Sequence, residues 1–394
     1  MEFKARCINF ELWFTNETEQ DMERIYRTLE TLIKADIDQA VQDGCNTVIG
    51  LLLYEGFLYK NEDDYYGLLR RVYDYGTSKG IKKFILVCGI VWDYQHELDR
   101  RNLNYEIIEF DYSAFAMWQT YKDCAIPAWN PNANKFMYLG GVPSRPNRIK
   151  LLSKFYDAGM LTDTQAIWSF YPPENPNDKE ICRQLCSNYT DEQYYHFLET
   201  NRRSVDNKYA GVAHYHKATG ADWKTEKFLE RDFFKDPNYI DPEVFTGTSI
   251  SILAEGGAFE PAWDFRFFTE KAWRAVVNRH PFILVDNEMR KEFARSRGLD
   301  IFDKFFIEPY DNDANLDGVV SNVKHFLNIV NEHKAEIAHA VDKNFQAYLR
   351  IINICEETLD YLNTTYAVPS SELAQWFRQK SFDHLFRIPD AVYS

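Results

Sequence analysis

The sequence predicts an α/β protein of two domains, each built on a parallel β-sheet that helices cover. The chain has 394 residues, of which 45% are hydrophobic, and this is more than one ordinary core requires. Apolar segments rich in Val, Ile and Leu alternate with amphipathic segments of helical spacing, a pattern typical of parallel sheets buried on both faces. A stretch rich in Pro and Asn, 124–135, separates two such series.

The first series contains four expected strands and three expected helices. The strands are 5–14, 46–54, 82–90 and 104–112, and the helices are 19–43, 62–79 and a short one that ends near Asp123. Helix 19–43 is preceded by Thr18, which stands three residues before Asp21 in a segment crowded with acids. Acids in the first turn stabilise the N-terminus of a helix, so this boundary is well marked.

The second series repeats the alternation beyond the linker. Its expected strands are 135–141, 164–171, 247–255 and 281–286, and its expected helices are 146–158, 269–279, 287–297 and a long one at 315–336. Segment 181–245 mixes short helices and loops in no clear order, and helical sequence continues to the C-terminus. We therefore divide the chain into two Rossmann-like domains, 1–130 and 131–335, and a helical segment, 336–394.

The charge of the chain argues against broad binding to nucleic acid or to anionic membranes. The formal net charge is −15, whereas such binding requires a positive field. A local basic groove stays an alternative to an ordinary solvated surface. The basic residues concerned are Arg70, Arg71, Lys79, Lys82, Lys83, Arg100, Arg101, Arg202 and Arg203.

Cysteine usage and hydropathy predict a cytoplasmic protein without a membrane span. The seven cysteines are scattered, and no basic region followed by a long apolar stretch stands at the N-terminus. No run of about 18 apolar residues occurs, so we expect no transmembrane helix. Cys182 and Cys186 could share a helix face, but no second pair stands near them, and we expect no metal ion.

A polar triplet, Thr269, Glu270 and Lys271, opens the expected helix 269–279. Strand 247–255 ends at Glu255, which would lie at the carboxyl edge of the second sheet, where open parallel sheets bind ligands. Thr269 suits a helix cap, but Lys271 in the first turn is unfavourable unless an anion lies opposite. A bound phosphate would supply that anion. The alternative is a simple capping turn with Lys271 bent into solvent.

The stretch ISILAEGGAFEPAWDFRFFTEKAWRAVVNRHPFILV, at 250–285, resembles the donor-binding signature of the fucosyltransferase-like glycosyltransferases. In that signature a strand ends in an acid, a Thr-Glu-Lys helix start follows, and an apolar strand then begins with proline. Segment 135–160, KFMYLGGVPSRPNRIKLLSKFYDAGM, is similar to the same group, and 298–315 is similar to related bacteriophage proteins. The resemblance covers 135–330 and has no equivalent in the first 130 residues.

The resemblance implies the GT-B arrangement, in which two Rossmann-like domains face each other and the second holds a nucleotide-sugar. It implies that Lys271 and Arg148 neutralise the donor diphosphate, and that Glu270 holds the sugar or the ribose. Glu255 matches the acid of the family's Glu-Asn-Ser motif. The GT-B enzymes bind their donors without a metal ion, so the nucleotide-sugar would be a co-substrate and no cofactor is expected.

Two positions depart from the family pattern. Phe267 stands where a tyrosine is expected, and Gly256 stands where an asparagine is expected. The identity of the base and of the sugar therefore stays open, and a fucose donor does not follow from the resemblance.

The acceptor hydroxyl needs a general base, which we expect at a strand end of the first domain. Asp93, after strand 82–90, is the first candidate, and Glu55, after strand 46–54, is the second. His96 and Asp111 follow. Each of these side chains has the alternative of a solvated or capping role.

We therefore expect an inverting glycosyltransferase in the cytoplasm, or in the host cytoplasm if the protein is viral. The acceptor would be either a hydroxymethylated pyrimidine of phage DNA or a glycan. A noncatalytic protein that binds a glycan or nucleotide is the main alternative. A nucleotide-dependent oxidoreductase is disfavoured because no Gly-x-Gly-x-x-Gly follows the first strand.

Overall fold

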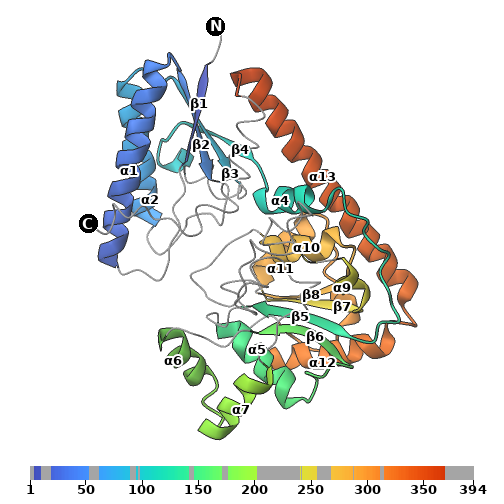
Figure 1. The fold of residues 1–394 in the computed structure, drawn as a ribbon. Helices are drawn as coiled ribbons and strands as arrows, with labels where there is room; N and C mark the ends of the chain where they lie inside the picture. Colours follow the sequence, from blue (N-terminus) through green and yellow to red (C-terminus); the bar gives the residue numbers. More distant parts are fainter. Residues whose placement is uncertain are drawn as a thin grey trace, which may run out of the picture. The chain divides into compact units, whose positions relative to one another are not determined.

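The computed structural model is an α/β protein with two four-stranded parallel sheets and a helical C-terminal part (Figure 1). It describes residues 4–9, 19–52, 62–88, 95, 98–141, 146–170, 176–201, 240, 242–254, 268–286, 288–310 and 315–368. The chain forms two compact units. The first unit comprises Met1–Ala116 and Arg350–Ser394, and the second comprises Met117–Leu349.

The sheet of the first unit confirms the predicted run of buried parallel strands. Its strands are β1 (Ala5–Asn9), β2 (Thr47–Leu52), β3 (Lys83–Cys88) and β4 (Tyr105–Glu109). They pair in parallel in the order β1-β2-β3-β4. Five of the six residues of β3 are buried, as expected for a central strand covered on both faces.

Helices α1 (Glu19–Gln42) and α2 (Glu62–Ser78) connect these strands and pack side by side. Two polar contacts fix the pair. The Tyr75 hydroxyl donates to Asp38 Oδ2 at 2.7 Å, and Arg71 Nε lies 2.6 Å from Glu30 Oε2. Helix α4 (Tyr112–Tyr121) follows β4.

The last turns of helix α13 (Lys334–Tyr366) pack against β3 and β4. The Thr358 hydroxyl donates to the carbonyl oxygen of Glu109 at 3.2 Å, and Lys83 Nζ donates to the Tyr366 hydroxyl at 2.5 Å. Lys83 also forms an ion pair with Glu106 at 2.6 Å. These contacts attach the helical C-terminal part to the first sheet, which lies more than 240 residues earlier in the chain.

The sheet of the second unit reverses its strand order in the middle. Its strands are β5 (Phe136–Gly141), β6 (Ala166–Phe170), β7 (Ile250–Ala254) and β8 (Phe282–Val285). They are parallel in the order β6-β5-β7-β8. The chain therefore leaves β5 toward one edge of the sheet and leaves β7 toward the other, so a topological switch point lies between β5 and β7.

Helices cover both faces of this second sheet. Helices α5 (Pro146–Asp157) and α12 (Leu316–Ile329) lie on one side, and α10 (Glu270–Val277) lies on the other (Figure 1). The remaining elements of the unit are α6 (Pro176–Leu185), α7 (Asp191–Asn201), α9 (Glu243–Thr246), α11 (Glu288–Ser296) and a 3-10 turn (Asp303–Phe305). An ion pair of 2.9 Å between Lys154 and Asp317 joins α5 to α12.

The long helix expected at 315–336 is interrupted. Helix α12 ends at Ile329, and α13 begins at Lys334. The backbone N–H groups of Glu332 and His333 both donate to the carbonyl of Ile329, which closes the turn. Glu336 Oε1, in the first turn of α13, lies 3.2 Å from Nδ1 of His333, the residue that precedes this helix. The apolar periodicity does not reveal this interruption.

Candidate functional site

The candidate site lies beside the carboxyl end of β7, next to the switch point of the second sheet. In open parallel sheets the helices that follow the two central strands begin at this edge, and their N-termini point toward it. Here α5 follows β5 and α10 is the next described helix after β7. Arg148 belongs to the first turn of α5 and Lys271 to the first turn of α10.

Thr269 caps α10, as the sequence predicts. Its backbone is extended, and its side-chain oxygen accepts a hydrogen bond from the backbone N–H of Lys271 at 3.3 Å. Thr269 is buried, with 5% of its surface exposed. The cap therefore fixes the start of the helix inside the protein.

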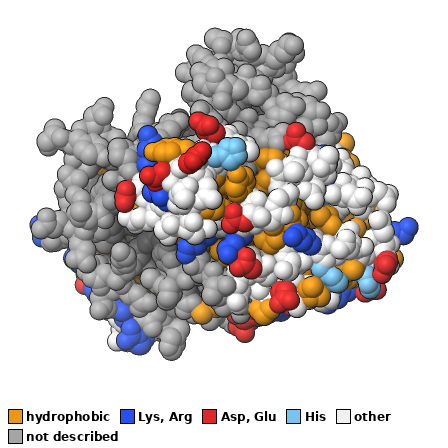
Figure 2. All heavy atoms as spheres, turned by 90° about the horizontal axis from the view of Figure 1, so that it is seen from below, with side chains coloured by type: hydrophobic (Ala, Val, Ile, Leu, Met, Phe, Trp, Pro, Cys, Tyr) orange, Lys and Arg blue, Asp and Glu red, His pale blue; other side chains and the backbone are white. Residues whose placement is uncertain are grey.

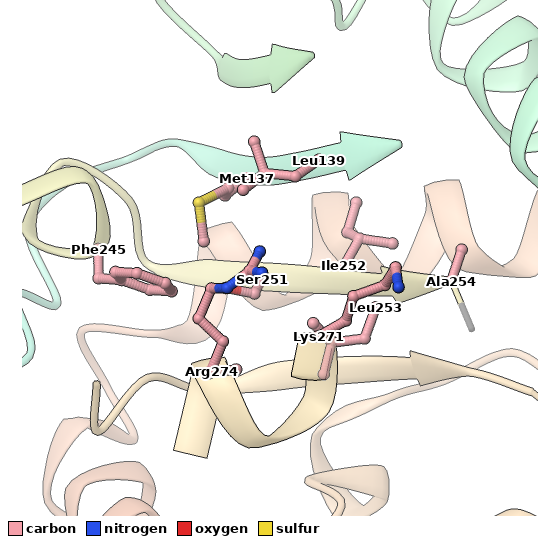
Figure 3. Close-up of a pocket in the computed structure, with 10 residues that line it drawn as sticks. Met137, Leu139, Phe245, Ser251, Ile252, Leu253, Ala254, Lys271 and Arg274 are labelled. Atoms are coloured by element: carbon pink, nitrogen blue, oxygen red, sulfur yellow. The ribbon is translucent and has the colours of Figure 1, made fainter. Parts of the chain in front are cut away.

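Lys271 does not bend into solvent. Its Nζ lies 2.5 Å from Glu270 Oε1 and 3.4 Å from the Thr269 hydroxyl, and its side chain is 26% exposed. In Figure 3 the side chain extends along β7 toward Ala254. The ammonium is thereby held at the mouth of a pocket between β7 and α10.

Glu270 is ionised throughout the physiological range. Burial of its carboxyl group raises the pKa, but the charges of Lys271 and Arg274 and the hydrogen bond from Lys271 lower it further, to about 2. Its side chain is 18% exposed. The acid is therefore a fixed negative charge beside two fixed positive charges.

Arg148 reaches the same end of β7 from α5. Its Nε donates to the carbonyl oxygen of Ala254 at 3.2 Å, and its own carbonyl accepts a hydrogen bond from the buried Tyr138 hydroxyl at 2.9 Å. Ala254 also lines the pocket together with Lys271. The structure thus brings Arg148 and Lys271, which are 123 positions apart in the sequence, to one strand end.

The pocket itself is formed by β5, β7, α9 and α10 (Figure 3). Its walls are mostly apolar, and its polar side chains are Ser251, Lys271 and Arg274. The residues that line it are Met137, Leu139, Phe245, Ser251, Ile252, Leu253, Ala254, Lys271, Arg274 and Ala275. A few convergent polar groups in an otherwise apolar concavity are typical of small-molecule sites.

Arg274 is the pocket residue that sequence reasoning missed. It lies one turn after Lys271 on α10, and Figure 3 shows its side chain extending from the helix toward Ser251 on β7. It is 7% exposed, although most residues around it are apolar. The signal in the sequence is an arginine flanked on both sides by the apolar residues of this helix, which are Ala272, Trp273, Ala275, Val276 and Val277.

Behind the pocket, His280 is buried and neutral. Its Nε2 lies 2.9 Å from the carbonyl oxygen of Thr248 and therefore donates, which leaves Nδ1 to accept from the Ser251 hydroxyl at 2.8 Å. Burial lowers the pKa of His280 to about 4, more than its hydrogen bonds raise it. The imidazole adds no positive charge and orients Ser251.

Glu55, Asp93, Glu255 and His96 lie outside the described residues. Asp111 is described, and its Oδ1 accepts a hydrogen bond from the backbone N–H of Ala114 at 2.9 Å. This is a helix cap at the start of α4, the alternative considered for this side chain.

Many cations of the first unit's candidate basic groove have partners. Arg71 pairs with Glu30, Lys79 with Asp38 at 3.0 Å, and Lys83 with Glu106. Arg70 donates to the backbone carbonyls of Arg101 and Asn102. Little of this positive charge is left for a phosphate backbone. On the face seen from below in Figure 2, basic and acidic side chains are likewise interspersed among apolar ones.

The cysteines are all free thiols. Cys182 and Cys186 are fully buried, and burial raises the pKa of Cys186 to about 11, so this pair is suited to packing. Within the described ranges, no cluster of three or more His, Cys, Asp or Glu side chains could hold a metal ion. No described helix combines the length and the apolar character needed to cross a bilayer.

Fold and site together define an α/β protein with two parallel sheets and a cationic, otherwise apolar pocket at the switch point of the second sheet. Comparison with protein-family models, with curated proteins and with solved structures finds no match.

Proposed function

We propose that the protein is a glycosyltransferase that transfers a sugar from a nucleotide-sugar to an acceptor hydroxyl. The observation that carries the proposal is the convergence of Arg148 and Lys271 at the carboxyl end of β7. The resemblance of 250–285 to the fucosyltransferase-like signature assigns the donor diphosphate to these same two residues. Two units that each contain a parallel sheet supply the parts of a GT-B enzyme.

The chemistry of the site suits this reaction. A departing nucleoside diphosphate gains negative charge in the transition state, and fixed cations beside a helix N-terminus stabilise charge where it develops. The Arg148 guanidinium can grip two phosphate oxygens, while Lys271 acts as a point charge. Glu270, held ionised next to Lys271, would accept hydrogen bonds from hydroxyl groups of the ribose or the sugar.

The general base and the acceptor belong to the first domain in this proposal. Asp93 stays the first candidate for the base and Glu55 the second. Because many cations of the first unit are paired with acids or carbonyls, a glycan acceptor is favoured over a hydroxymethylated base of phage DNA. We expect inversion at the anomeric carbon. We also expect the reaction to take place in the cytoplasm, where the nucleotide-sugar would be present.

A thermal-shift panel of UDP, GDP, CDP and their sugars tests donor binding, because a ligand of the native state raises its stability by about 2.7 kcal/mol at 100 times Kd. Arg148→Met and Lys271→Met should each weaken binding by about 10- to 100-fold, since each removes a charge-assisted contact. Lys154→Met is the matched control on α5, because Lys154 pairs with Asp317 at the surface. Equal binding by Lys271→Met and the control would refute the proposal.

Hydrolysis of the bound donor separates an enzyme from a binding protein. A transferase without acceptor releases the sugar slowly, and Asp93→Asn should reduce transfer to an added acceptor much more than donor affinity. Donor binding with no hydrolysis and no transfer to any glycan or DNA acceptor would leave the noncatalytic binding protein as the correct class.

A further inference from the structure

The charge of Arg274 is unusual within the described part of the second unit. The side chain is 93% buried, and its Nε has no hydrogen-bond partner. By contrast, the side chain of Arg290 is 1% exposed and lies 2.6 Å from Asp286. An unpaired buried guanidinium is costly, because arginine cannot lose its proton to escape the desolvation penalty.

Among the described residues, no carboxylate forms a hydrogen bond or a close ion pair with Arg274. The other residues that line its pocket include Met137 and Leu139 of β5, Phe245 of α9 and Ser251 of β7. The hydroxyl of Ser251 donates to His280, which is neutral. On its own helix the acid is Glu270, whose carboxylate interacts electrostatically with Arg274 but is hydrogen-bonded to Lys271 at 2.5 Å.

We infer that Arg274 is a ligand-binding residue, whose guanidinium binds an anionic oxygen of a diphosphate that enters the pocket between β5, β7 and α10. Lys271 binds the neighbouring phosphate nearer the mouth of the pocket. Residues three apart on a helix have Cβ atoms about 5–6 Å apart and share a face, so two adjacent phosphates can meet both cations. The inference rests on the proposed function, because the diphosphate would be that of the donor.

This arrangement separates two ligand classes. A diphosphate meets both Lys271 and Arg274, whereas a monophosphate meets one of them. We therefore expect inorganic pyrophosphate, UDP and GDP to bind more tightly than inorganic phosphate, UMP and GMP. Arg274 should account for most of that preference, because its planar fork can grip two oxygens from a position that is 93% buried.

The test compares Arg274→Met, Arg274→Lys and Arg274→Gln with the native protein. The probes are pyrophosphate, phosphate, UDP, GDP and the two monophosphates, measured by titration calorimetry and thermal shift. Arg295→Gln is the control, because Arg295 pairs with Glu288 and Asp303 at the surface of the same unit. We expect Arg274→Met to lose roughly 10- to 100-fold in diphosphate affinity and to retain its monophosphate affinity within a few fold.

Stability without ligand gives a second readout. If the guanidinium exists for a ligand, Arg274→Met replaces a buried charge that has no hydrogen-bonded counter-ion with an apolar side chain and should raise the thermal midpoint of the free protein. A purely structural arginine would lower the midpoint when removed. Should the Met variant fail to fold, Arg274→Lys keeps the charge but loses the fork, and a diphosphate affinity equal to the native value would overturn the inference.

The outcomes also distinguish this inference from the proposed function. Diphosphate binding that depends on Lys271 but not on Arg274 rejects the inference and leaves the transferase standing. Pyrophosphate binding that depends on Arg274, without any nucleotide-sugar turnover, supports the inference and rejects the transferase. Absence of binding by pyrophosphate and all nucleotides rejects both.

Discussion

Lys271 Nζ lies 2.5 Å from Oε1 of Glu270, its neighbour in the first turn of α10. The pair places a carboxylate against an ammonium at a helix N-terminus, where the helix dipole favours the acid and disfavours the base. Glu270 thus compensates the charge of Lys271, and a phosphate bound as we propose would replace or join that carboxylate. The contact holds the Lys271 ammonium in place.

Glu270→Gln should reduce the dependence of the free energy of unfolding on pH under acidic conditions. The folded pKa is about 2 and the ordinary value is 4.5, so the contribution of Glu270 is complete above pH 4.5 and is lost as the pH falls toward 2. It is on the order of 3 kcal/mol. Urea unfolding between pH 7 and pH 3 should show a shallower loss in the variant. The exposed control Glu199→Gln should follow the native curve, and an unchanged slope in Glu270→Gln would contradict the assignment.

His280→Gln should act in a higher pH window. The pKa of His280 is about 4 in the folded protein and 6.5 ordinarily. Between these two values the unfolded chain binds a proton that the folded protein does not bind, so the free energy of unfolding decreases as the pH is lowered. The native protein should lose on the order of 3 kcal/mol from this group between pH 7 and pH 4. The variant should be less stable at pH 7, because it loses the hydrogen bonds to Ser251 and Thr248. Its free energy of unfolding should decrease less than that of the native protein between pH 7 and pH 4. Exposed His196→Gln serves as the control.

Asp286 and Arg290 form a fully buried ion pair of 2.6 Å at the carboxyl end of β8. Asp286→Ala should lower the free energy of unfolding by about 3–5 kcal/mol, because it leaves Arg290 buried without that carboxylate. The double variant Asp286→Leu/Arg290→Met should recover much of the loss, since it removes both charges together. Urea denaturation of the native protein and the two variants measures the recovery, and a double variant at least as destabilised as Asp286→Ala would exclude the coupling.

Gly318→Ala should destabilise the protein by about 2 kcal/mol, although alanine normally favours a helix. Gly318 lies in the first turn of α12, and a Cβ there would overlap the carbonyl oxygen of Pro309. The control is Gly67→Ala in α2, where the new Cβ would meet the flexible end of Arg71 at 3.3 Å. Thermal unfolding should give opposite signs for the two substitutions, and a stabilised Gly318→Ala would show that the close approach is absent.

The positions of the strands could be predicted from the sequence, because buried parallel strands consist of continuous apolar runs. Segments 46–54 and 82–90 contain β2 and β3, and 281–286 contains β8. The strand order of the second sheet could not be predicted, since the pairing of β5 with β7 joins residues more than 100 positions apart. The break after Ile329 was missed because apolar periodicity continues through it.

Part of the site was predictable for similar reasons. The helix cap at Thr269 depends only on neighbouring residues, so the sequence alone predicts it. The approach of Arg148 to the end of β7 depends on the strand order, and only the resemblance had grouped Arg148 with Lys271. Arg274 was missed because its importance comes from the absence of a partner in three dimensions, which spacing along a helix does not reveal.

Helix α13 begins in the second unit and ends in the first, so the first unit is discontinuous in sequence and the second is inserted within it. A ribosome therefore completes all four strands of the first sheet long before Tyr366, the residue that contacts Lys83 on β3, has been synthesised. The second unit can mature on its own during translation, whereas the first has to wait for almost the whole chain. Truncation before Tyr366 should accordingly damage the N-terminal sheet rather than the pocket of the second unit.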